Sequence, residues 1–74
     1  MSQRLPVVSG ARLVDALRRV GWEQVRQRGS HVRLKHPDRP TALVVPLHRE
    51  LKRGTLAAIL RDAGLDRDDL RRLL

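Results

Sequence analysis

The stretch WEQVRQRGSHVRLKHPDRPTALVV, residues 22–45, decides the fold, because its apolar residues alternate with polar ones instead of recurring every three or four positions. Residues typical of turns interrupt the alternation twice. Strands joined by short turns pair with one another, so the stretch predicts an antiparallel meander. We expect strands at 22–27, 31–35 and 41–45, with turns at 28–30 and 37–40.

The middle strand has a pattern that predicts one face with side chains suited to catalysis. Side chains at alternate positions of a strand share one side of the sheet. His31, Arg33 and Lys35 therefore share one face, while Val32 and Leu34 share the other. An imidazole beside two cations can hold a phosphodiester and move protons near neutral pH.

The segment before the meander has the periodicity of an amphipathic helix. Apolar residues recur at i, i+3, i+4 and i+7 from Leu13 to Val20. Ser9 is the expected N-cap, and Gly21 suits the left-handed residue that follows a helix.

The segment after the meander predicts two more helices. A second stripe of the same spacing runs over 56–63, with Thr55 as the expected N-cap and Gly64 as the stop. Asp66 and Asp69 predict the capping box of a short last helix.

The order of elements is therefore α-β-β-β-α-α, and the fold class is α+β. We expect a three-stranded antiparallel sheet with helices on its apolar face, while the face carrying His31 stays open. This is the layout of a double-stranded-RNA-binding-like fold. We expect residues 1–74 to form one domain.

The basic charge lies in the part of the chain that contains the meander. Residues 1–53 hold 12 Arg and Lys against 4 Asp and Glu, whereas residues 54–74 hold 4 of each. A one-sided excess of this kind indicates a polyanionic partner such as nucleic acid.

The rare residues narrow the chemistry. The chain has no Cys, no Phe, no Tyr and one Trp, which excludes thiol chemistry and the aromatic platforms on which sheet-based RNA readers stack bases. His36 lies at an odd offset from His31 and beside Pro37, so we interpret it as a solvated turn residue. No carboxylate cluster accompanies a histidine, and we expect neither a metal nor a cofactor.

We expect neither a signal peptide nor a membrane span, because the sequence shows no signal-peptide pattern and no run of about 18 apolar residues. Together with the absence of cysteine, this predicts a cytoplasmic protein.

His31 is the candidate catalytic residue. RNA supplies its own nucleophile, the 2′-hydroxyl, and an imidazole within reach can take that proton or protonate the leaving oxygen. DNA lacks the 2′-hydroxyl, so such chemistry selects RNA. The candidate RNA-binding residues around it are Arg28, Gly29, Ser30, Arg33 and Lys35.

Further basic residues extend the candidate surface. We expect phosphate contacts also from Arg26, Arg39, Arg49, Lys52 and Arg53. His48, which follows the third strand, is an accessory candidate for phosphate or proton handling. The alternative is that His48 packs or hydrogen-bonds within its loop.

Two other functions fit parts of the sequence. The same fold can bind RNA without cleaving it. Residues 56–74 also resemble a helix-turn-helix with Gly64 in the turn, which suggests a DNA-binding regulator. Its second helix would bring three aspartates toward the phosphates, which disfavours this alternative.

Several short motifs follow one another in a fixed order. They are Val20-Gly21-Trp22, Gly29-Ser30-His31, Val45-Pro46-x-His48 and Gly54-Thr55-Leu56-x-x-Ile59-Leu60-x-x-Ala63-Gly64-Leu65. This ordered set resembles the HicA family of mRNA interferase toxins. The resemblance implies a double-stranded-RNA-binding-like fold, ribosome-independent cleavage of mRNA and a catalytic histidine at His31. It also implies a HicB-type antitoxin that covers the active face, and therefore a hetero-oligomer.

Overall fold

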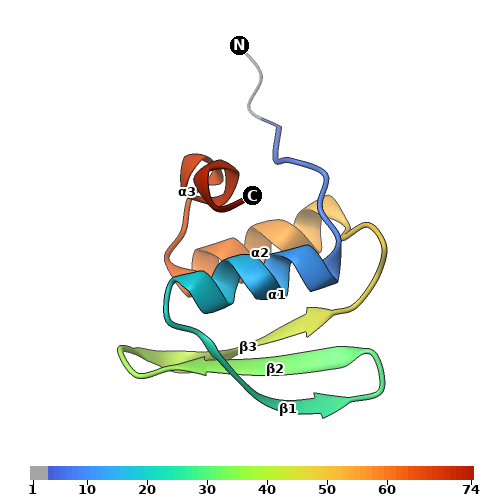
Figure 1. Ribbon diagram of the computed structural model, residues 1–74. Helices are drawn as coiled ribbons and strands as arrows, with labels where there is room; N and C mark the ends of the chain where they lie inside the picture. Colours follow the sequence, from blue (N-terminus) through green and yellow to red (C-terminus); the bar gives the residue numbers. More distant parts are fainter. Residues whose placement is uncertain (1–3) are drawn as a thin grey trace.

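The computed structural model describes residues 4–74 and has the element order that the sequence predicts (Figure 1). The strands form one antiparallel sheet in the order β1-β2-β3. The α+β class and the α-β-β-β-α-α order are thus confirmed. The elements are α1 (Gly10–Arg19), β1 (Glu23–Arg28), β2 (His31–His36), β3 (Arg39–Pro46), α2 (Arg53–Ala63) and α3 (Arg67–Leu73).

The two long helices cover one face of the sheet. In Figure 1, α1 and α2 lie on the same side of the strands, and α3 lies beyond them. Burial alternates along β2, where Val32 and Leu34 are buried and His31, Arg33 and Lys35 are exposed. The other face of the sheet is therefore open, as the alternation in the sequence predicts.

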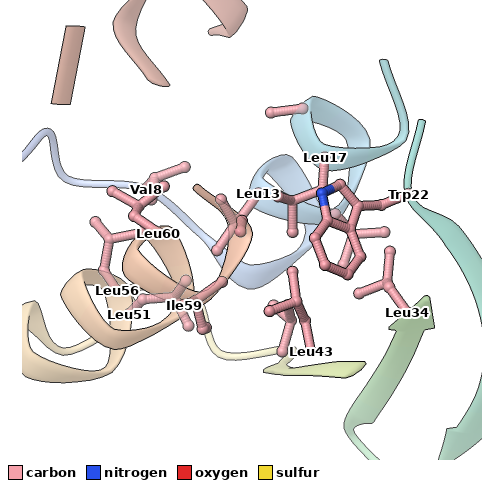
Figure 2. Close-up of a cluster of buried hydrophobic side chains, with 14 of the residues drawn as sticks. Val8, Leu13, Leu17, Trp22, Leu34, Leu43, Leu51, Leu56, Ile59 and Leu60 are labelled. Carbon is pink, nitrogen blue, oxygen red and sulfur yellow. The ribbon is translucent and has the colours of Figure 1, made fainter. Parts of the chain in front are cut away.

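The core joins the helices to β2 and β3. Leu13 and Leu17 of α1 lie over Leu34 and Leu43 of the sheet, and Trp22 closes one end of the cluster (Figure 2). Burying a side chain of this size stabilises the fold by about 1.5–3 kcal/mol. The helices pack against one face of the sheet only, so the other face is accessible to a ligand.

The first helix is capped as predicted. The Ser9 side chain accepts a hydrogen bond from the backbone N–H of Arg12, at 3.1 Å. Gly21 follows the helix with a φ of 99°, a value that favours glycine.

Thr55 is not the N-cap of α2, and that prediction is wrong. The helix begins at Arg53, with Lys52 as N-cap and without a capping bond from its side chain. Leu51 is buried just before the helix, and its N–H donates to the carbonyl of Val8. We attribute the early start to this buried anchor, which fixes the chain one turn before Thr55.

His36 is a structural residue, and its interpretation as a solvated turn residue is wrong. Its Nδ1 accepts the backbone N–H of Asp38, and its Nε2 lies 3.0 Å from the carbonyl of Val20. The ring also meets Trp22 edge-on, with centroids 5.2 Å apart. The neutral tautomer with its hydrogen on Nε2 satisfies both bonds, so His36 ties the end of α1 to the β2–β3 turn.

The capping box of α3 is confirmed, and it makes stability depend on pH. Asp66 and Asp69 exchange side-chain-to-backbone hydrogen bonds of 2.7 and 2.9 Å. The backbone N–H of Asp66 is the main cause that lowers the pKa of Asp69 below its ordinary 3.8, and Arg72 contributes. A carboxyl whose pKa is lowered by folding stabilises the fold above its unfolded pKa, and this stabilisation is lost as pH falls through the folded value.

We therefore expect Asp69→Ala to lower the urea midpoint at pH 7, and we expect the gap from wild type to close as pH falls below 3.8 and through the lowered pKa of Asp69. Asp68→Ala is the control, since it removes a carboxylate of the same turn outside the capping box. A gap of equal size at pH 7 and pH 2 contradicts the assignment.

Within residues 4–74, no helix is long and apolar enough to span a membrane.

Candidate active site

A shallow hollow on the open face of the sheet contains the candidate catalytic histidine. Its volume is about 180 Å³, and its lining residues are Arg26, Arg28, His31, Arg33 and Val44. Larger hollows exist, of about 300 Å³ beside residues 4–7 and about 620 Å³ beside Trp22. Neither is lined by a histidine, so we take the smaller hollow as the candidate site on its chemistry rather than its size.

The register of the sheet arranges the lining residues in two rows. His31 lies opposite Arg28 on β1 and Pro46 on β3. Residues directly opposite in an antiparallel sheet share a face. The next row along the strand has Arg33 in the centre, with Arg26 on one side and Val44 on the other.

A β-bulge in β1 brings the two arginines of that strand to the open face. Trp22 is buried toward the helices, so strict alternation would turn Arg26 and Arg28 to the helix side as well. The pairing instead skips Val25, and the alternation is reversed after it. The bulge was not predicted, although the shared parity of Trp22 with the two arginines is a signal of it in the sequence.

The turn before His31 is fixed from both sides. Gly29 has a φ of 57°, in the left-handed region that favours glycine. The Gln27 side chain donates to the Gly29 carbonyl at 3.1 Å, and the Leu47 backbone N–H donates to the Ser30 carbonyl at 2.6 Å. These bonds hold the start of β2 against both neighbouring segments.

The cations of the hollow have no carboxylate partners. Within residues 4–74, the ion pairs join Arg61 to Asp62, Arg67 to Asp68 and Arg72 to Asp69, all far along the chain from the sheet. The nearest acid in the register is Glu23, which lies opposite Lys35 in the third row. The hollow therefore presents three guanidinium groups and an imidazole without a neutralising acid.

The structure brings together some of the predicted site residues. Arg28, His31 and Arg33 line one hollow, whereas Lys35 shares their face without lining it. Arg26 was expected only as a general phosphate contact, and it lies in the hollow beside Val44, which the sequence did not single out.

His48 lies at the same end of the sheet as His31 but outside the hollow. Its side chain is exposed, and its carbonyl accepts the N–H of Gly10 at 2.9 Å. The preceding residue, Leu47, is bonded to Ser30. His48 is therefore near the turn that leads into His31, but its side chain does not line the hollow.

Arg39 is engaged elsewhere in the fold. Its guanidinium donates to the carbonyl of Asp62 at 3.4 Å, at the end of α2. A Cβ at Gly64 would lie 2.1 Å from the same group. The contact satisfies a free carbonyl of the last helical turn, so Arg39 has a structural role, and its expected phosphate contact stays a prediction.

Within the described part of the chain, no three His, Asp or Glu side chains gather in a way that could hold a metal ion.

The fold and the hollow together define a class of small basic α+β proteins that present an imidazole among guanidinium groups on an open sheet. The model of the family described as "HicA toxin of bacterial toxin-antitoxin" matches residues 10–65, which is most of the chain. The chain therefore belongs to this family, and it is a toxin of a toxin–antitoxin system, with an antitoxin as its partner. No curated protein was found to match the chain.

Proposed function

We propose that the protein is an endoribonuclease that cleaves mRNA by metal-independent acid–base catalysis with His31. The observation that carries this proposal is the hollow in which His31 lies among Arg28 and Arg33 with no carboxylate nearby. A phosphodiester fits this charge, and the exposed imidazole is available for proton transfer. Because mRNA is the substrate, the proposal places the activity in the cytoplasm.

In the proposed reaction, the 2′-oxygen of RNA attacks the adjacent phosphorus, and the bond from phosphorus to the 5′-oxygen breaks. His31 takes the proton of the 2′-hydroxyl or gives a proton to the leaving 5′-oxygen, and water carries the other proton. The products are a 2′,3′-cyclic phosphate and a 5′-hydroxyl, so atoms and charges balance without a cofactor. Arg28, which lies opposite His31, stabilises the negative charge that builds on the oxygens of the cleaved phosphate, and Arg33 is a phosphate ligand in the neighbouring row.

The remaining candidate residues have supporting roles. Lys35 extends the basic face by one row and contributes to affinity for the phosphate backbone. Gly29 and Ser30 shape the turn that leads into His31. His48 is the accessory candidate, since its backbone is tied to the same end of the sheet.

The partner we propose is a HicB-type antitoxin that covers the open face. The face carries Arg26, Arg28, Arg33 and Lys35 against the single acid Glu23. An acidic surface of the antitoxin complements this charge and excludes RNA from the hollow.

The test of the proposed function is cleavage of one RNA in three chemical forms. We expect the purified protein to cleave an RNA oligonucleotide in the presence of EDTA. We expect no cleavage of the DNA of the same sequence, or of an RNA with 2′-deoxynucleotides at the cleavage positions, because both lack the nucleophile. RNA binding without cleavage favours the non-catalytic binding module, and cleavage of the 2′-deoxy substrate contradicts the mechanism.

A further inference from the structure

Two rows of cations lie next to each other on the open face. The first row pairs His31 with Arg28, and the second pairs Arg33 with Arg26. Their central residues are two positions apart on β2, which is about 7 Å along an antiparallel strand. This spacing is comparable with that of successive phosphates in an extended nucleic-acid strand.

The second row is unfavourable for the free protein. Arg26 and Arg33 lie directly opposite each other, and like charges at such positions destabilise a sheet. No carboxylate within residues 4–74 forms an ion pair with either of them. An anion bound between the two guanidinium groups would remove this repulsion.

The arrangement also has a defined length. In the third row Lys35 lies opposite Glu23, so the carboxylate offsets part of the positive charge that Lys35 offers to the RNA backbone. Val44 borders the second row on the β3 side and offers no charge. The unopposed positive charge thus covers two rows.

We propose that Arg26 and Arg33 form a second phosphate subsite, which holds the phosphate next to the one that is cleaved at His31. The substrate strand then lies along β2 with two consecutive phosphates bound. The place of the cleaved phosphate rests on the proposed function, whereas binding of the neighbouring phosphate does not require catalysis. The bulge at Val25 has a role in this subsite, because it turns Arg26 toward Arg33.

The experiment combines a protein variant with a change of a single phosphate. RNA substrates carry a neutral methylphosphonate in place of the phosphate on the 5′ or on the 3′ side of the cleaved one. We expect Arg26→Gln to lower kcat/KM on the all-phosphate RNA by about ten- to hundred-fold, as for a lost charge-assisted hydrogen bond. One of the two methylphosphonates should cost wild type a similar factor and cost Arg26→Gln nothing further.

Binding separates this inference from the proposed function. A 2′-O-methyl strand cannot be cleaved, and its affinity is measured with the same set of methylphosphonates. We expect Arg26→Gln and the same methylphosphonate each to weaken binding, with no further loss when the two are combined. In Arg26→Gln the slope of log affinity against log salt should be reduced by about 0.7. Coupling in binding without any cleavage supports the subsite and rejects the catalytic proposal.

Stability provides a readout that a structural role would not give. Because the Arg26–Arg33 pair is repulsive in the free protein, Arg26→Gln should raise the urea midpoint while it weakens RNA binding. Arg18→Gln is the matched control, since it removes an exposed charge from α1 and should change kcat/KM less than two-fold. The proposal is overturned if Arg26→Gln lowers kcat/KM by the same factor on the all-phosphate RNA and on both methylphosphonate RNAs. It is also overturned if Arg26→Gln lowers the urea midpoint.

Discussion

Replacing His31 by alanine is expected to lower the rate of RNA cleavage by about 10²–10⁴-fold, which is the usual contribution of a general acid or base. His31 is the single imidazole of the hollow, and the residue opposite it on β3 is Pro46, which has no group that can transfer a proton. Arg28 and Arg33 remain charged at neutral pH and cannot take over this step. Binding of RNA should change far less, since three guanidinium groups remain.

The His31 variants are informative because the fold does not depend on this side chain. His31 is exposed and lies outside the buried cluster, so the free energy of unfolding should stay within about 0.5 kcal/mol of the wild-type value. His31→Gln is the matched variant, which keeps hydrogen bonding but has no imidazole to transfer a proton. The measurements are single-turnover cleavage of a synthetic RNA and mRNA integrity in cells without antitoxin. Full cleavage by a folded variant would refute the assigned role.

The alternation of residues in β2 was enough to predict the two faces of the sheet. Val32 and Leu34 are buried, and His31 and Arg33 are exposed. The alternation determines this arrangement because a shift of the register by one residue would bury the charged side chains and expose the apolar ones. The helices followed equally well from their apolar stripes. Such features depend on short-range patterns that a sequence contains in full.

Features that depend on tertiary contacts were not predictable in the same way. The N-cap of α2 is set by the burial of Leu51 against the chain at Val8, and Thr55 lost that role. Arg39 and His36 found backbone partners on other elements, from Asp62 and Val20. A charge or imidazole in a turn thus does not reveal whether it serves a ligand or the end of a distant helix.

Residues 4–9 and 66–74, the described residues outside the family match, lie away from the open face (Figure 1). The match ends at residue 65, and α3 follows it with Leu70 fully buried. The side chain of Arg71 donates to the carbonyl of Arg4, and that of Arg19 donates to the carbonyl of Leu73. These contacts lie on the outer side of the helical layer, so α3 leaves the open face of the sheet uncovered.

Gly10→Ala is expected to destabilise the fold by about 2–4 kcal/mol, from overpacking of about 1–3 kcal/mol and a lost hydrogen bond of about 1 kcal/mol. An ideal Cβ at Gly10 would lie 1.9 Å from the carbonyl oxygen of Pro46 and 2.9 Å from the Cα of Leu47. Both are backbone atoms, which cannot swing aside as a side chain can. The N–H of Gly10 also donates to the carbonyl of His48, so any shift weakens that bond as well.

Gly54, at the start of α2, provides the matched control for Gly10→Ala. Gly54 is also in the first turn of a helix, but a Cβ there would meet nothing within 4 Å. Gly54→Ala should therefore stabilise the protein, by about 0.5–1 kcal/mol, because alanine loses less backbone entropy in a helix.

Urea unfolding of both variants measures the two changes in the free energy of unfolding. A chain of 74 residues has roughly 4–11 kcal/mol of stability, so Gly10→Ala should lower the urea midpoint well below that of wild type. Equal effects of the two substitutions would mean that helix propensity, and not the close approach of α1 to Pro46 opposite His31, sets the need for glycine.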